Sequence, residues 1–298
     1  MSIFPTRILL STNGSEATAL ATEAAVDLST KSGSELHLVH VWHDVPGPYA
    51  RKFVRSELRR QGQEILDEQV QKIEASGGAV AKAHLRGGRT SDEIVRLSDE
   101  LGVGLLVVGS RAMRTMRRIL VGSHSEAIVH HAHVPVLVVR RGESAWPPAR
   151  LIVGEDFSED AKRAGEIAAS IGALYGAHLL LLYANPDLPE ASPGEAPTES
   201  GEMREREEGT LQNRTNELEG ILGSHPETRL SGGSPAAAIL EEAQRESPPA
   251  LIAVGSRGLA GITRTRLGSV STKIVTSALG PVLVTPNVEG ALDPPPYG

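Results

Sequence analysis

Short apolar runs alternate along the chain with longer stretches in which apolar residues recur every three or four positions. The runs have the length of buried strands, and the periodic stretches are typical of amphipathic helices. In the first half we expect strands at residues 7–10, 36–41, 80–85, 105–108 and 135–139. Helices are expected between them, the first opened by Asn13 and Glu16, which have the spacing of a capping box. This alternation predicts a parallel sheet with helices on both faces.

The same order of runs and periodic stretches returns in the second half of the chain. The polar segments after the first strands lie 143 residues apart, and the glycine-rich loops after the fourth strands lie 146 residues apart. The pairs aligned in this way are Asn13 with Asp156, Val41 with Ala184, Gly109 with Gly255, Gly122 with Gly268 and Ser123 with Ser269. We therefore predict a duplicated α/β domain, and 298 residues are enough for two cores of ordinary size.

The domain boundaries follow from this repeat. We expect a first domain at residues 1–143, a linker at 144–149, a second domain at 150–288 and a tail at 289–298. Two adjacent prolines, Pro147 and Pro148, stiffen the linker.

Candidate chemistry concentrates in the glycine-rich stretch 255–271, which follows an apolar run and precedes a periodic segment. Gly255 and Gly258 can adopt positive φ and let a ligand approach the main chain closely. Gly268 stands where the next helix should begin, and the free N–H groups of a helix start favour a phosphate. The alternative is that the glycines only form a tight turn and that Ser269 only caps the helix.

The spacing of glycine, two residues, glycine, nine residues and Gly-Ser resembles the nucleotide loop of the ATP-binding universal stress proteins. The likeness covers nearly the whole chain twice, so the chain is similar to the tandem form of that family. The resemblance implies two five-stranded domains of the adenine nucleotide alpha-hydrolase-like fold and ATP binding mainly in the second, with Mg left open. The contacts it implies there with base, ribose and phosphates are Asp156, Ala184, Gly255, Gly258, Gly268, Ser269, Val270 and Ser271. Arg257 of the same loop is added as a candidate phosphate contact because of its paired N–H donors.

The first half departs from this pattern at two positions. Asn13 replaces the aspartate, and Ala112 stands where the second glycine belongs. Alanine disfavours positive φ by about 1 kcal/mol or more. We therefore expect a degenerate site, which binds ATP weakly, binds something else or is a structural partner. The candidate contacts in this half are Asn13, Val41, Gly109, Gly122, Ser123 and Ser125.

Asp156 itself has two interpretations. As a short acceptor at a helix start it could take a hydrogen bond from a ligand, or it could only cap the helix.

The arginines of both glycine-rich loops could meet triphosphate oxygens through paired N–H donors, or they could lie on a solvated flap. The proline- and glutamate-rich segment 185–209 is expected to be a connector rather than a lid, followed by a short helix near 211–222.

Composition narrows the class of protein. The net charge of −7 and the pI of about 5.8 argue against a general role in binding nucleic acid or anionic membranes. The absence of cysteine excludes disulfides and thiol catalysis. The N-terminal segment lacks the basic start and long apolar run of a signal peptide, and no apolar run approaches the roughly 20 residues that span a bilayer. We therefore expect a cytoplasmic protein.

The resemblance, with the complete second loop and Asp156, implies a nucleotide-responsive stress regulator with an unknown protein partner. The alternatives are an adaptor that binds no nucleotide and a slow ATPase, but no residue stands out as a general base.

The histidines within 124–133 lack a positioned carboxylate, so no metal site is expected. The last strands, 135–139 and 281–284, are strongly apolar. By the resemblance we expect them to pair the two halves within one chain, with a homodimer also open.

Overall fold

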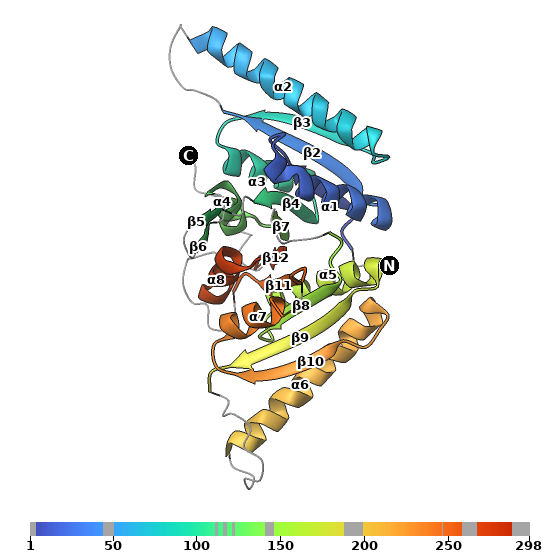
Figure 1. Cartoon of the computed structure of the whole chain (residues 1–298), viewed down its shortest axis with the longest axis vertical. Coiled ribbons are helices and arrows are strands. Elements are labelled where there is room, and N and C mark those ends of the chain that lie inside the picture. The colour runs from blue at the N-terminus through green and yellow to red at the C-terminus, as the bar shows by residue number, and fades with distance from the viewer. Residues whose placement is uncertain are drawn as a thin grey trace. The chain divides into compact units, whose positions relative to one another are not determined.

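The computed structural model (Figure 1) divides into two compact units, with the boundary between Trp146 and Pro147. We call them the N-terminal unit and the C-terminal unit and describe each by itself. The structure describes residues 4–43, 51–110, 113–115, 118–120, 123–140, 146–187, 199–245, 247–257 and 267–287.

The N-terminal unit is an open parallel sheet with helices on both faces. Its elements are β1 (Arg7–Ser11), α1 (Glu16–Ser32), β2 (Glu35–Trp42), α2 (Arg51–Ala75), β3 (Lys82–Gly87), α3 (Thr90–Leu101), β4 (Leu105–Ser110), β5 (Met113–Thr115), β6 (Arg118–Leu120), α4 (Ser123–His131) and β7 (Val136–Arg140). The parallel strands follow the order β3-β2-β1-β4-β7. Strands β5 and β6 form a separate antiparallel pair within the first glycine-rich loop, which the sequence pattern did not predict.

The C-terminal unit repeats this architecture. Its elements are β8 (Arg150–Glu155), α5 (Glu159–Tyr175), β9 (His178–Asn185), α6 (Glu199–Leu222), β10 (Glu227–Gly232), α7 (Pro235–Ala243), β11 (Leu251–Gly255), α8 (Ser269–Ser277) and β12 (Val282–Thr285). Its strands are parallel in the order β10-β9-β8-β11-β12. No helix in the described ranges is long and apolar enough to cross a membrane.

The strand order fixes where the loops meet. Parallel strands need right-handed crossovers, which place the first two helices of each unit on one face and the last two on the other. The central strands are covered on both sides and form continuous apolar runs, such as the fully buried residues 8–10 of β1 and 151–153 of β8. The carboxyl ends of β1 and β4, and of β8 and β11, are neighbours at the point where the strand order reverses. The predicted fold class is confirmed.

Helix α6 is longer than the sequence indicated. It begins at Glu199, whereas we expected a connector over 185–209 and a helix only from about residue 211. Glutamate and arginine are good helix formers, but the polar first turns lack the apolar periodicity on which the prediction relied. Of the side chains described in this helix, from residue 204 on, Leu211 is the first that is buried. Residues 188–198 of the expected connector lie outside the described part of the chain.

A stacked pair of histidines joins β2 and β3 in the N-terminal unit. His37 Nδ1 lies 3.1 Å from His84 Nε2, and the ring centroids are 5.4 Å apart. The pKa of His84 is lowered to about 4, first by burial and then by His37, Lys82 and Arg86, against the opposing effect of Glu100. His84 is therefore neutral at neutral pH and can form the ring-to-ring hydrogen bond.

The low pKa of His84 predicts a loss of stability in acid. Between pH 6.5 and 4 the unfolded chain binds more protons at this residue than the folded chain, so stability falls as the pH decreases through this window. Replacing His84 with Gln should flatten that part of the stability profile. Urea unfolding of both proteins at a series of pH values measures it, and NMR titration of the His84 ring gives its pKa directly. A wild-type His84 that titrates near 6.5 would contradict the expectation.

Candidate functional site

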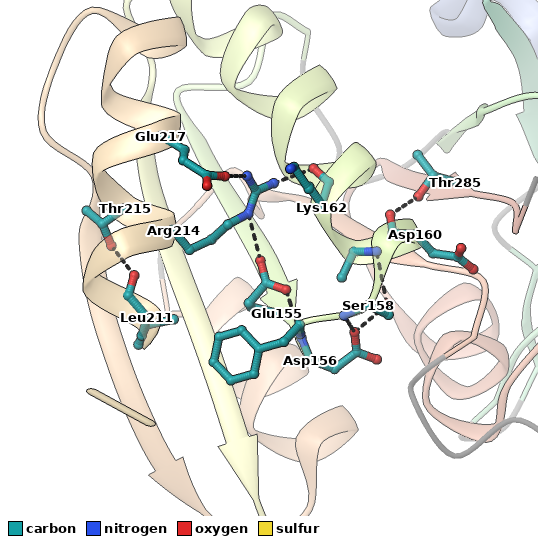
Figure 2. A network of polar contacts seen from close by, with 12 residues as sticks. Glu155, Asp156, Ser158, Asp160, Lys162, Leu211, Arg214, Thr215, Glu217 and Thr285 are labelled. Carbon is teal, nitrogen blue, oxygen red and sulfur yellow. Dashed lines mark hydrogen bonds and ion pairs between the residues drawn. The ribbon is translucent and has the colours of Figure 1, made fainter. Parts of the chain in front are cut away.

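The turn after β8 is organised by Asp156. Its Oδ1 accepts hydrogen bonds from Ser158 N at 3.0 Å and from Ser158 Oγ at 2.5 Å (Figure 2). Ser158 is the N-cap of α5, and its Oγ accepts from Ala161 N at 3.2 Å. The interpretation of Asp156 as the helix cap is therefore wrong: it braces the residue that caps the helix. Its second oxygen, Oδ2, takes part in none of these bonds.

The N-terminal unit builds the same turn with Asn13. The Asn13 Oδ1 accepts from Ser15 N at 3.1 Å and from Ser15 Oγ at 2.6 Å. Ser15 is the N-cap of α1, so the predicted capping box of Asn13 with Glu16 is wrong. Asparagine keeps the turn and replaces the second carboxylate oxygen with an NH₂ donor. The two units thus differ at this position in hydrogen-bonding chemistry and not in conformation.

The glycine that ends β11 has a packing role. A Cβ on Gly255 would lie 2.7 Å from Asp160 Cβ and 2.8 Å from Ala161 N, in the first turn of α5. Gly109 is placed in the same way, because its Cβ would lie 2.8 Å from the carbonyl oxygen of Ala17. Gly255 is not among the residues with positive φ. The expected positive φ is therefore wrong, and the missing side chain lets a helix approach a strand. The assignment of Gly255 as a ligand contact stays a prediction.

Asp160 ties the two loops of the site together. Its Oδ2 accepts from Ser256 Oγ at 3.0 Å and from Arg257 N at 3.3 Å. Its carbonyl oxygen accepts from Thr285 Oγ1 at 2.5 Å. Burial raises the pKa of this carboxyl, while the hydrogen bonds from Ser256 and Arg257 oppose the rise. Asp160 is not among the residues predicted from the sequence, although the repeat offers a signal: the equivalent residue, Ala17, is apolar.

The far end of the glycine-rich loop returns to its start. Gly268 N donates to the carbonyl oxygen of Ser256 at 2.6 Å, and Gly268 is the N-cap of α8 without a side-chain cap. Ser269 is exposed, Val270 is half-buried, and the buried Ser271 donates its hydroxyl to the carbonyl oxygen of Gly255 at 2.7 Å. Among the described residues no side chain caps the first amides of α8, as a phosphate contact requires.

The same serine contact occurs in the N-terminal unit. Ser125 Oγ donates to the carbonyl oxygen of Gly109 at 2.9 Å. Ser123 begins α4, and its side chain is outside the described part, as are Gly122 and, in the other unit, Gly258. The assignments of Gly122 and Gly258 to a nucleotide loop remain predictions.

The strands bring most candidates to one edge. The register pairs Glu155 with Tyr183, so Asp156 follows directly beside Ala184, which is 8% exposed. Val254 pairs with Gly154, which brings the end of β11 to the other side of β8. In the N-terminal unit Val41 is half-buried near the end of β2.

Arg257 adds a cation at this edge. Its Nε is buried and has no hydrogen-bond partner within the described ranges. Its carbonyl oxygen lies 3.3 Å from Ser158 Oγ, so the main chain at Arg257 is held against the turn that contains Asp156. A buried guanidinium N–H without a partner is costly unless a ligand or another group accepts from it.

The fold and these loops define a tandem of open-sheet α/β domains with their paired loops at the switch in strand order. Residues 5–140 and 149–286 each match the sequence profile of the universal stress protein family. The chain therefore belongs to the universal stress protein family, in its tandem form.

Known proteins resemble the chain over most of its length. A universal stress protein of Mycolicibacterium smegmatis is 29% identical over 249 residues, covering 80% of this chain and 81% of that protein. One of Mycobacterium tuberculosis is 33% identical over 242 residues, covering 77% of this chain and 74% of that protein. The crystal structure of a universal stress protein from Archaeoglobus fulgidus matches with a TM-score of 0.70 at 26% identity, covering 94% of this chain and 98% of that one.

The packing role of Gly255 predicts a stability effect. In Gly255→Ala the new methyl group meets main-chain atoms of α5 that cannot move aside, so we expect the free energy of unfolding to fall by about 1–3 kcal/mol. Gly220→Ala is the control, because a Cβ there meets nothing within 4 Å inside an exposed stretch of α6. That change should stabilise by about 0.5–1 kcal/mol. Urea unfolding measures both, and an unchanged Gly255→Ala protein would refute the packing role.

Proposed function

We propose that the C-terminal unit binds ATP at the edge formed by the ends of β8, β9 and β11, and that the protein acts as a nucleotide-responsive stress regulator. The observation that carries the proposal is the hydrogen bonding of the Asp156 carboxylate. One carboxylate oxygen is fixed by Ser158, which sets the direction of the side chain, and the other is outside these bonds. A fixed acceptor of this kind suits an amino or hydroxyl group of a nucleoside.

The phosphate side of the proposal rests on α8 and Arg257. The helix begins at Ser269 after Gly268, which brings no side-chain oxygen to its first amides. The positive end of the helix dipole and those amides favour an anion. Arg257 Nε, buried without a partner in the described part of the chain, supplies a donor of the kind that pairs with phosphate oxygens. These groups fit a nucleotide phosphate.

Mg²⁺ is left out of the proposal as a protein-held ion. Such an ion usually takes one or two carboxylates together with phosphate oxygens and water. Glu155 and Asp160 already accept hydrogen bonds from the protein at this edge. Asp156 is assigned to the nucleoside. Any Mg²⁺ would therefore arrive with the triphosphate.

The N-terminal unit is proposed to be the weaker site. It keeps the turn, the packing glycine and the Ser125 contact. Asn13 removes the second acceptor oxygen that Asp156 offers. A ligand that approaches Asp156 with a donor would meet an NH₂ group at Asn13 if the amide oxygen keeps its bonds to Ser15.

The two units supply a matched test of Asp156. Asp156→Asn should keep the turn, because Asn13 makes the same hydrogen bonds in the same chain. It removes one acceptor and one charge, so we expect ATP affinity to fall about tenfold, equivalent to about 1.4 kcal/mol, with an unchanged melting temperature. Isothermal titration calorimetry on the full chain measures the affinity.

Asp67→Asn is the control for the lost charge, since Asp67 is exposed on α2 in the other unit. It should bind ATP as the wild type does. The absence of heat and of a thermal shift for the wild type at millimolar ATP would overturn the proposed function. ATP binding that is unchanged in Asp156→Asn would instead overturn the role given to Asp156.

A further inference from the structure

The turn between the first strand and the first helix is held differently in the two units. In the N-terminal unit the hydroxyl of Thr12 accepts from Gly14 N at 3.2 Å. In the C-terminal unit Glu155 stands at the position of Thr12. Its Oε1 accepts from Asp156 N at 3.1 Å and from Phe157 N at 2.8 Å. The neutral Thr12 hydroxyl, which accepts from one main-chain amide, is thus replaced by the Glu155 carboxylate, which accepts from two.

Phe157 makes this stronger hold necessary. It adopts φ 61°, where its counterpart Gly14 adopts φ 72°. Glycine tolerates this left-handed region, whereas a bulky side chain is strained in it and persists only when its surroundings hold it there. The Phe157 ring packs against Tyr183 with centroids 4.8 Å apart. The charge-assisted hydrogen bonds from Glu155 hold the main chain of the same residue.

Glu155 depends on a residue of α6. Its side chain is 1% exposed, and Arg214 Nε donates to Glu155 Oε2 at 3.2 Å (Figure 2). Burial raises the pKa of Glu155, against the opposing effects of the Phe157 amide and Arg214. Arg214 also donates to Glu217 Oε2 at 2.6 Å and to the carbonyl oxygen of Lys162. The turn leads into α5, but the arginine that neutralises its buried carboxylate comes from α6.

The N-terminal unit contains a neutral counterpart of Arg214. Gln69 lies on α2, 145 residues before Arg214. The equivalent strands that follow, β3 and β10, begin at Lys82 and Glu227, which are also 145 residues apart, so Gln69 and Arg214 occupy equivalent positions. The Nε2 of Gln69 lies 3.8 Å from the position that a Cβ would take on Gly14, so this side chain stands beside the turn. One unit therefore surrounds the turn with Thr, Gly and Gln, and the other with Glu, Phe and Arg.

We propose that Arg214 is a positioning residue, which acts through Glu155 to hold the turn that presents Asp156 and thereby couples α6 to the nucleotide site. The inference rests on the proposed function for its ligand, but the coupling of Arg214 to the turn stands on geometry alone. Because coupling between two sites is reciprocal, a ligand held by Asp156 stabilises the part of α6 around Arg214. The N-terminal unit has the neutral Gln69 in place of this charged link.

The first experiment needs no nucleotide. Hydrogen exchange at the Asp156 and Phe157 amides is measured by NMR in the full chain. We expect about tenfold faster exchange in Arg214→Gln and about threefold in Arg214→Lys, which keeps the charge but loses the guanidinium fork. The Gly14 amide is the internal control and should not change. Unchanged exchange at both turn amides in these variants overturns the proposal, and Arg214→Lys carries the test if Arg214→Gln does not fold.

A triple variant separates positioning from general destabilisation. Glu155→Thr, Phe157→Gly and Arg214→Gln together give the C-terminal turn the residues that the N-terminal unit uses, so we expect it to fold. In the wild type, ATP should slow exchange over residues 211–218 of α6 about tenfold, and in the triple variant it should leave this segment unchanged even where ATP still binds. ATP-dependent protection of α6 that persists in the triple variant overturns the coupling.

The two proposals fail in different ways. If the wild type binds no ATP, the proposed function is lost, and the exchange rates of the Asp156 and Phe157 amides still decide whether Arg214 holds the turn. If ATP binds and those exchange rates are the same in the wild type and in the Arg214 variants, the nucleotide site stands and the positioning role is lost.

Discussion

The candidate site depends on the close contact between the first turn of α5 and the end of β11. Gly255 makes this contact possible because a side chain there would overlap Asp160 and Ala161. Parallel pairing of β8 and β11 puts the Asp156 turn and the start of the glycine-rich loop at the same edge, and this contact lets them approach closely. Asp160 then joins them through Ser256 and the main chain of Arg257. Without this packing, the first turn of α5 and the end of β11 could not approach each other as closely as they do.

Both units keep this packing and diverge around it. Gly109 meets α1 as Gly255 meets α5, and each of these glycine carbonyls accepts from a serine in the first turn of the following helix. The C-terminal unit adds charged groups where the N-terminal unit has neutral ones, at Glu155 and Asp160. Buried carboxylates need partners to offset the loss of hydration. The added charges therefore come with added links between elements, and those links are what distinguish the two copies.

Much of the fold could be predicted from the sequence because buried parallel strands leave continuous apolar runs and the chain shows them twice. The antiparallel pair β5 and β6 and the early start of α6 could not, since neither carries an apolar period. At the candidate site, Asp156 could be named from the sequence, but the hydrogen bond that Ser158 donates to its Oδ1 could not. It gave no sign of Arg214, because the contact with Glu155 joins residues 59 positions apart. Such contacts depend on which helix face packs on which strand.

The strand-end glycine also limits what the motif can diagnose. Gly109 and Gly255 are required by helix packing whether or not a ligand is present. A tandem chain can therefore lose its ligand in one copy and still retain the first glycine of the signature in both. That glycine alone therefore does not tell how many domains of such proteins bind a nucleotide. Under the proposed function, the residue that braces the helix cap, aspartate in one copy and asparagine in the other, is the more informative marker.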